Sequence, residues 1–382
     1  MSDLPAQAEV VVVGGGVMGA SAAFHLAEAG VDVLLLERGS LGQGSTCKAA
    51  GGVRANFSDP LNIALGARSL ECFGDFSLRP GQEIDLHRSG YLFVLTAPEQ
   101  VRDFEEAIAL QQSMGLRAEL VDVDRALSLS PYLNPDGVLA AAWSPDDGHC
   151  TPESVVLGYA SGARQYGGKI CTGVEVTGIA VNGSEINAVH TTQGLVRTSV
   201  VVDCAGAWSP QVAEMVGVEL PVAPVRRELV VTEALPDPLS TAFTIDYGST
   251  FYWHREGPGI LMGFSDQSVE PDFDLTADPE FTVKLAELAL LRAPALIDVG
   301  IRTGWTGLYE VTPDHNALLG ESSTVSRFLY ATGFSGHGFL QGPAVGEILR
   351  DLVLGCEPFV DVSALSVDRF ESGELRPERN IV

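Results

Sequence analysis

Apolar residues in this chain occur in short runs separated by glycine and polar residues, a pattern typical of alternating strands and helices. The run Val10–Val13 consists only of β-branched residues, so we expect a strand that is buried on both faces of a parallel sheet. The alanine-rich segment 20–29 has high helix propensity, and Gly30 follows it as a helix-terminating residue. A second apolar strand is expected over residues 31–36. The start of the chain therefore predicts a β-α-β unit.

The same pattern predicts further helices and strands along the rest of the chain. Helices are expected over residues 63–76, 101–114, 152–166, 281–291 and 343–354. Strands are expected over residues 90–95, 170–179, 185–192, 195–202 and 328–332, and the region 225–263 is rich in strands. Asn182-Gly183 favours a tight hairpin turn.

No linker-like or low-complexity stretch divides the 382 residues into separate parts. We therefore expect an α/β fold in which a Rossmann-like nucleotide-binding domain is interwoven with an α+β substrate domain built on a mixed sheet. We assign residues 1–85, 146–224 and 306–382 to the nucleotide-binding domain. Residues 86–145 and 225–305 are assigned to the substrate domain.

A glycine motif follows the first strand, because residues 14–19 read Gly-Gly-Gly-Val-Met-Gly and fit G-x-G-x-x-G. Gly14 allows a tight turn, Gly16 lets a pyrophosphate approach the backbone, and Gly19 allows close packing of helix and strand. Glu37 ends the second strand, where a carboxylate can bind ribose hydroxyls. The alternative is an ordinary β-α-β unit with a glycine-rich turn. The order of strand, glycines, helix, strand and acid favours a dinucleotide site, and leaves FAD and NAD both open.

Composition narrows the function classes. The net charge of −27 makes a nucleic-acid or anionic-membrane surface an unlikely partner, and the 46% hydrophobic content is that of a globular protein. No signal peptide and no membrane-spanning run is recognised, and the six cysteines form no C-x-x-C pair and no metal-ligand spacing with the seven histidines. We expect no metal, free thiols and a cytoplasmic location.

Four blocks of sequence carry a family resemblance: residues 14–37, 44–54, 202–208, and 307–309 together with 333–338. They resemble the D-amino-acid-oxidase superfamily of FAD-dependent amine oxidoreductases, in particular its sarcosine oxidase, dimethylglycine dehydrogenase and L-proline dehydrogenase β-subunit branch. The resemblance implies FAD rather than NAD, hydride transfer from an amine C–H to flavin N5, and an imine product that water hydrolyses.

The resemblance also implies which residues contact the cofactor. The expected FAD-binding residues are Gly14, Gly16, Val17, Met18, Gly19, Glu37, Arg38, Gly44, Ser45, Thr46, Lys48, Ala49, Ala50, Gly51, Val174, Ala205, Gly206, Trp208, Arg302, Gly333, Gly336, His337, Gly338, Phe339 and Leu340. A helix beginning near Pro343 would direct its positive end toward the glycine loop before it, where negative charge on a reduced flavin would be stabilised.

Four residues are expected to take part in catalysis. Arg54 occupies the place of the family arginine that pairs with a substrate carboxylate, a task that suits the bidentate guanidinium. Tyr309 matches an active-site tyrosine of the family, and Tyr252 lies near the place of another. His337 is expected beside the flavin. The plainer interpretations are a structural ion pair for Arg54 and buried core tyrosines with one hydrogen bond each.

Departures from the family pattern refine this expectation. Gly307, Lys48 and Pro152 stand where relatives attach flavin covalently, so we expect non-covalent FAD. Leu340 replaces the lysine that helps sarcosine oxidase to bind the substrate carboxylate, which argues against sarcosine itself. Leu261 replaces the lysine that promotes reaction with oxygen, which favours a dehydrogenase.

The sequence leaves several functions open. We favour an FAD-dependent dehydrogenase of a secondary amine or of an N-methyl or cyclic amino acid, with a small-molecule substrate and a separate electron acceptor. The alternatives are an amino-acid oxidase that produces hydrogen peroxide, an NAD-linked dehydrogenase, and a non-catalytic flavoprotein or assembly subunit. A partner subunit is also left open.

Overall fold

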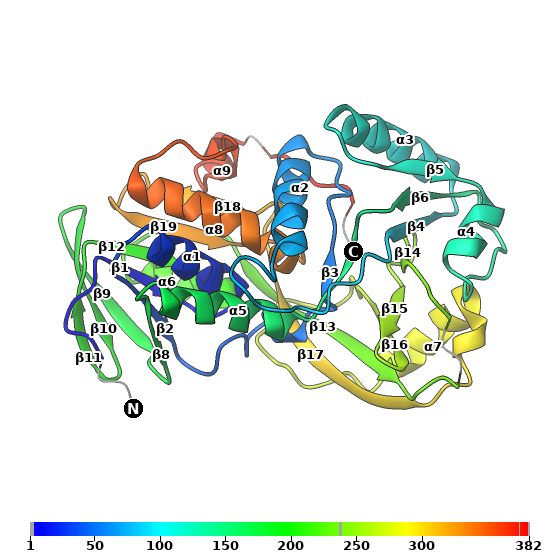
Figure 1. Cartoon of the computed structure of the whole chain (residues 1–382), viewed down its shortest axis with the longest axis horizontal. Helices are drawn as coiled ribbons and strands as arrows, with labels where there is room; N and C mark the ends of the chain where they lie inside the picture. Colours follow the sequence, from blue (N-terminus) through cyan, green and yellow to red (C-terminus); the bar gives the residue numbers. More distant parts are fainter. Residues whose placement is uncertain (1–3, 237–238, 374, 381–382) are drawn as a thin grey trace.

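The computed structural model describes residues 4–236, 239–373 and 375–380. Its chain is organised around a six-stranded and an eight-stranded sheet, which lie on opposite sides of the molecule (Figure 1). Helix α2 (Pro60–Gly74) and the short strand β3 (Gly52–Val53) lie in the middle of this view. None of the described helices is long and apolar enough to cross a membrane.

The six-stranded sheet has a parallel centre. Strand β1 (Val10–Val13) pairs in parallel with β2 (Val33–Glu37) on one side and with β12 (Val200–Asp203) on the other. The full strand order is β18-β19-β12-β1-β2-β8, with β8 spanning Lys169–Thr172, β18 spanning Leu318–Glu321 and β19 spanning Phe328–Thr332. β18 is antiparallel to β19, whereas the other pairs are parallel.

Both faces of β1 are buried, as its sequence predicts. Val10 and Val12 pack into one cluster with residues of helix α1, whereas Val11 and Val13 pack into a second cluster against a smaller sheet. The helical layer contains α1 (Val17–Glu28), α2, α5 (Pro152–Gln165) and α8 (Gly338–Leu354). The smaller sheet contains β9 (Val176–Asn182), β10 (Glu185–Thr191) and β11 (Gly194–Arg197). This layering confirms the predicted Rossmann-like α/β class.

The eight-stranded sheet is mixed, because β4 pairs in parallel with β14 and antiparallel with β6. Its strand order is β17 (Ile301–Val311), β13 (Ala223–Thr232), β16 (Gly259–Phe264), β15 (Tyr252–Glu256), β14 (Phe243–Asp246), β4 (Tyr91–Leu95), β6 (Ala140–Ser144) and β5 (Glu119–Val121). Its helices are α3 (Pro98–Ser113), α4 (Val123–Leu129) and α7 (Phe281–Arg292). The remaining elements are β7 (Gly148–His149), α6 (Ser209–Glu214), α9 (Arg369–Ser372) and four 3-10 turns at Thr46–Lys48, Gly206–Trp208, Pro294–Leu296 and Ser363–Leu365.

Three predicted elements differ in the structure. The strand predicted over 170–179 is two strands in different sheets, separated near Gly173, which has a φ of +70°. The strand predicted over 195–202 is likewise divided between β11 and β12. Helix α8 begins at Gly338 rather than near Pro343, so this proline lies inside the helix. The hydroxyl of Ser69 accepts a hydrogen bond from the backbone N–H of Ala344 at 3.2 Å, which supplies a partner beside the proline.

The two sheets draw on alternating parts of the chain. The six-stranded sheet takes its strands from residues 10–37, 169–172, 200–203 and 318–332. The eight-stranded sheet takes its strands from residues 91–144 and 223–311. The predicted domain boundary at residue 306 falls inside β17. The exact division into two domains stays a prediction.

Candidate active site

One cavity of about 500 Å³ extends from the glycine turn after β1 to strands of the eight-stranded sheet. Its walls include the loop 43–54, the turn 204–208 and the loop that leads into α8. Cavities of this size between structural layers commonly hold a cofactor and a small molecule. The cavity is therefore the candidate active site.

The glycine turn is shaped by close backbone contacts. Gly14 has a φ of +105°, and an ideal Cβ on it would lie 2.4 Å from the carbonyl oxygen of Cys204. An ideal Cβ on Gly19 would lie 1.9 Å from the carbonyl oxygen of Gly14. Only glycine fits at these two positions, because any side chain would force β1, β12 and α1 apart.

Glu37 has a role at this turn that the sequence did not reveal. Its carboxylate accepts hydrogen bonds from the backbone N–H groups of Gly15 at 2.7 Å and Gly39 at 2.6 Å. The same side chain lines the cavity. Glu37 therefore joins the glycine turn to the end of β2, and its contact with a ribose stays a prediction.

The N-terminus of α1 opens into the cavity beside this turn. Its N-cap residue is Gly16, which has no side chain to satisfy the free N–H groups, and the N–H of Val17 donates to Oγ1 of Thr46 at 3.1 Å. Gly16, Val17 and Met18 all line the cavity. A helix end of this kind favours an anion, and the absence of a side chain at Gly16 fits close approach of the pyrophosphate of a dinucleotide.

Most of the expected cofactor residues line this one cavity. The exceptions are Gly19, Gly333 and Arg302. Gly19 packs beneath the turn, and an ideal Cβ on Gly333 would lie 2.4 Å from Cγ2 of Thr312, so both glycines support the wall from behind. Arg302 is exposed on β17 and is not among the residues that line the cavity, so its expected contact with the cofactor stays a prediction.

Three tyrosines line the part of the cavity next to the eight-stranded sheet, and each lies over a glycine. An ideal Cβ would lie 1.8 Å from the hydroxyl of Tyr91 if placed on Gly52, and 2.4 Å from the hydroxyl of Tyr252 if placed on Gly263. The third pair is Tyr309 and Gly336, with 2.5 Å between the ideal Cβ and ring atom Cε2. Burial raises the pKa of all three phenols, so they stay protonated. We call this region the tyrosine chamber.

Tyr91 was missed by the sequence analysis, which brought only Tyr252 and Tyr309 to the site. It lies on β4, and its ring stacks on Phe243 with centroids 4.3 Å apart. The signal in the sequence was weak, because a tyrosine at the start of an apolar strand is usually a core residue.

Arg54 lies in the wall of the chamber and is buried, with 4% of its surface exposed. Its guanidinium donates to the backbone carbonyl oxygens of Asn56 and, at 2.7 Å, of Asn380. It also lies over the ring of Phe57, 4.3 Å from the centroid. Burial lowers the pKa of this guanidinium, and nearby phenols and the carboxyl groups of Glu378 and Asp147 partly offset that effect. The C-terminal segment thus helps to position Arg54.

Arg227 is a second arginine of the chamber, and the sequence analysis did not find it. It lies on β13 opposite Gly307 of β17, and its guanidinium carbon is 5.2 Å from the ring centroid of Tyr309. The sequence did contain a signal. Val225, Leu229 and Val231 are buried at alternate positions of β13, so Arg227 interrupts an apolar face.

His337 is the N-cap residue of α8 and also lines the chamber. Its ring packs edge-on against Phe57 with centroids 5.0 Å apart. Burial and the charge of Arg54 hold its pKa well below the usual range, so the imidazole is neutral. Among the described residues its Nε2 is buried without a hydrogen-bond partner. The atom is therefore available to a bound molecule.

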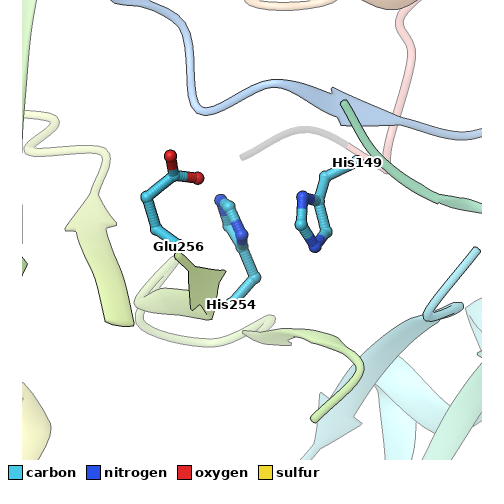
Figure 2. A group of neighbouring side chains, drawn as sticks. All are labelled: His149, His254 and Glu256. Carbon is cyan, nitrogen blue, oxygen red and sulfur yellow. The ribbon is translucent and has the colours of Figure 1, made fainter. Parts of the chain in front are cut away.

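Two histidines and a glutamate form a separate group at the edge of the cavity wall. Figure 2 shows His254 and Glu256 on β15 beside His149, and their ligand atoms lie within 4.8 Å of one another. Both ring nitrogens of His254 already face carbonyl oxygens, Nδ1 that of Arg255 at 2.8 Å and Nε2 that of Ala50 at 2.9 Å. A metal would have to displace one of these contacts. The group therefore joins β15 to the loop at Ala50, and the expected absence of a metal stays a prediction.

The positions at which the chain departs from the family pattern lie in different surroundings. An ideal Cβ on Gly307 would lie 3.0 Å from Cβ of Lys48, and both residues line the cavity. Leu340 also lines it, packed with Phe57. Leu261 is buried in an apolar cluster with Tyr252 and does not line the cavity, so it contributes only apolar packing behind the chamber.

A Rossmann-like sheet with a glycine turn that opens on a large cavity is typical of dinucleotide-dependent enzymes. The sequence profile of the DAO family, described as FAD dependent oxidoreductase, matches residues 9–352. The chain belongs to this family of FAD-dependent oxidoreductases.

Curated relatives agree with this assignment. The mitochondrial dimethylglycine dehydrogenase of Rattus norvegicus is 30% identical over 386 residues, which cover 95% of this chain and 45% of the relative. The FAD-dependent oxidoreductase domain-containing protein 1 of Xenopus laevis is 32% identical, with 99% of this chain and 85% of the relative covered. The chain thus spans less than half the length of the first of these relatives. Some relatives are mitochondrial, so a cytoplasmic location stays a prediction.

Solved structures show the same architecture. The L-proline dehydrogenase of P. horikoshii is 32% identical with a TM-score of 0.94, covering 98% of this chain and 100% of that protein. A glycine oxidase from Geobacillus kaustophilus is 26% identical with a TM-score of 0.86, and the match covers 95% of this chain and 99% of that protein. The glycine turn and the N-terminus of α1 both fit a flavin dinucleotide in the cavity.

Proposed function

We propose that this protein oxidises a secondary amine, or an N-methyl or cyclic amino acid, to an imine. The observation that carries the proposal is the tyrosine chamber, where the buried Arg54 and the neutral His337 line the same cavity as the glycine turn. Bound FAD would supply the hydride acceptor at its N5 atom. The proline dehydrogenase and dimethylglycine dehydrogenase likenesses support a substrate of this class.

The residues of the chamber suit this reaction. Arg54 would hold the substrate carboxylate, because a guanidinium binds a carboxylate through two parallel hydrogen bonds. The positive charges of Arg54 and Arg227 disfavour the protonated form of the substrate amine and so favour its neutral form. The lone pair of the neutral amine assists the loss of hydride from the neighbouring carbon. The three tyrosine rings exclude water, and Nε2 of His337 would hydrogen-bond the substrate.

The electron acceptor is proposed to be a dye or protein rather than oxygen. Lys48 is the one lysine among the described residues that line the cavity, and Leu261 offers no charge to it. In the family resemblance a lysine at the position of Leu261 promotes oxygen reduction, so we expect slow reoxidation without it. Stopped-flow mixing of reduced enzyme with oxygenated buffer tests this, and fast reoxidation with stoichiometric peroxide would favour the oxidase alternative.

An anaerobic screen of amines tests the reaction itself. The visible flavin band should bleach with secondary or cyclic amino acids and not with primary alcohols or with NADH alone. Retained flavin that no amine bleaches would support a non-catalytic flavoprotein instead.

The same preparation tests attachment of the cofactor. Acid precipitation should release all the flavin into the supernatant, because Gly307, Lys48 and Pro152 offer neither the cysteine nor the histidine used by the covalent relatives.

A further inference from the structure

Among the described residues, no carboxylate forms a hydrogen bond or an ion pair with the two guanidinium groups of the tyrosine chamber. Arg54 and Arg227 direct their hydrogen bonds to backbone carbonyl oxygens, those of Asn56 and Asn380 for Arg54 and those of Arg226 and Asp266 for Arg227. Backbone carbonyls are dipoles and do not neutralise a cation. The chamber therefore carries two guanidinium charges that no carboxylate of the described residues contacts directly, although Glu378, Asp147 and Asp266 act on them from a distance.

Two buried arginines elsewhere in the chain have a carboxylate that compensates their charge. Arg292 donates to the carboxylate of Asp246 at 3.2 Å, and Arg369 donates to the carboxylate of Asp314 at 2.9 Å. Buried charges are usually paired in this way, because an unpaired ion in a low-dielectric site is costly. The absence of such a partner at the chamber arginines points to an anion that comes from outside the chain.

Arg227 has an additional free donor. Among the described residues, its Nε is a buried nitrogen with no hydrogen-bond partner. Its guanidinium lies against the ring of Tyr309, and the charges of Arg54 and Arg227 both act on the phenol of that residue. Tyr309 thus lies near both arginines. A substrate bound beside Tyr309 would therefore be close to two guanidinium groups.

We propose that the substrate carries two acidic groups, an N-alkylated or cyclic amino dicarboxylic acid whose second carboxylate binds Arg227. This inference rests on the proposed function and adds a substrate class to it. Arg54 would bind the carboxylate next to the reacting carbon. Arg227 would bind the side-chain carboxylate and select against substrates that leave it without a partner, because an unfilled buried donor costs more than a missing apolar contact.

Equilibrium binding tests the inference without any turnover. The flavin spectrum of the purified holoenzyme is titrated with glutarate and succinate, and with butyrate and acetate for comparison. The dicarboxylates should bind at least tenfold more tightly than the monocarboxylates. In Arg227→Gln that preference should disappear. Equal binding of both classes to the wild-type enzyme would overturn the inference.

Anaerobic flavin reduction gives the second test. N-methylaspartate and N-methylglutamate are compared with N-methylalanine and proline, each amino acid in both enantiomers. Arg227→Gln should lower the second-order rate constant of reduction at least thirtyfold for the dicarboxylic substrates and at most threefold for the others. Arg226→Gln is the matched control, since this neighbouring side chain forms an ion pair with Glu228 at 3.2 Å and does not line the cavity. A similar loss for both substrate classes would assign Arg227 a structural role and overturn the inference.

Different outcomes would contradict the proposed amine oxidation and the inferred dicarboxylic substrate. If dicarboxylates bind selectively but no amine reduces the flavin, the proposed reaction is wrong and the anion site remains. If monocarboxylic amines reduce the flavin as well as dicarboxylic ones, the reaction stands and the dicarboxylate inference is wrong. If Arg227→Gln or Arg227→Lys loses its FAD, Arg227 belongs to the cofactor site and the inference is also wrong.

Discussion

The ring of Tyr309 lies so close to Gly336 that an ideal Cβ on the glycine would be 2.5 Å from its Cε2 atom. Gly336 belongs to the loop before α8, whereas Tyr309 comes from β17 of the other sheet. This contact brings the proposed cofactor side and the proposed substrate side of the cavity together at one point. The size of residue 336 thus sets the position of a chamber wall.

We expect Gly336→Ala to displace Tyr309 and to lower the second-order rate constant of flavin reduction at least tenfold. Gly81→Ala is a matched control for backbone strain, because Gly336 has a φ of +98° and Gly81 has a φ of +97° with no heavy atom within 4 Å of an ideal Cβ. Both variants should lose some thermal stability, and only the first should lose activity. Equal activity in the two variants would show that the contact does not position the tyrosine.

Removal of the Glu37 carboxylate should weaken FAD binding. The side chain accepts two backbone hydrogen bonds at the glycine turn, and a hydrogen bond to a charged group contributes about 1.5–3 kcal/mol. The dissociation constant for FAD should therefore rise about 10- to 100-fold in Glu37→Ala, measured by fluorescence during titration of the apoprotein. Glu9→Ala is the control, since Glu9 accepts a backbone hydrogen bond from Asp32 at an exposed position. Unchanged flavin content after dialysis would contradict this role.

Exchange of Arg54 for lysine should impair substrate binding more than chemistry. The guanidinium contacts the carbonyl oxygens of Asn56 and Asn380 and still presents N–H groups to the chamber, whereas one ammonium group cannot do both. We expect KM for a carboxylated substrate to rise at least tenfold, with a smaller change in kcat. Arg125→Lys, at an exposed position of α4, should be kinetically normal. An unchanged KM in Arg54→Lys would place the carboxylate elsewhere.

Stability should fall as the pH rises through the acidic range, because burial raises the pKa of Asp203 from 3.8 to about 7. Asp203 is fully buried at the end of β12, and its Oδ2 has no partner among the described residues. Below the unfolded-state pKa both states are protonated, and stability is full. Between that value and pH 7 only the unfolded state ionises, so stability is lost, on the order of 2–4 kcal/mol in total.

Asp203→Asn should remove much of this loss, because an amide does not ionise. The measurement is Tm of the apoprotein between pH 4 and pH 8, with Asp75→Asn at an exposed position as the control. A Tm profile in Asp203→Asn that is parallel to the wild-type profile would mean that Asp203 is ionised in the folded protein.

The sequence by itself determined the nucleotide half of this protein. Gly14, Gly16 and Glu37 are close in sequence, and each follows from a local requirement: a turn with positive φ, a close backbone approach, and an acid at a strand end. The buried strand Val10–Val13 followed from its composition alone. Such local rules need no knowledge of distant parts of the chain, so the buried strand and the positive φ of Gly14 agree with the structure, and the cofactor contacts of Gly16 and Glu37 stay predictions.

Only the tertiary structure decided the chamber. Tyr91, Arg227 and Tyr309 come from three strands that are far apart in sequence, and Asn380 reaches Arg54 from near the other end of the chain. Their proximity depends on the pairing of β13 with β17 and on the placement of two sheets, which no local pattern contains. The place of Arg302 outside the cavity was decided in the same way. The charge of the chamber is a property of the assembled fold, because only the tertiary structure shows that Arg54 and Arg227 donate to backbone carbonyl oxygens.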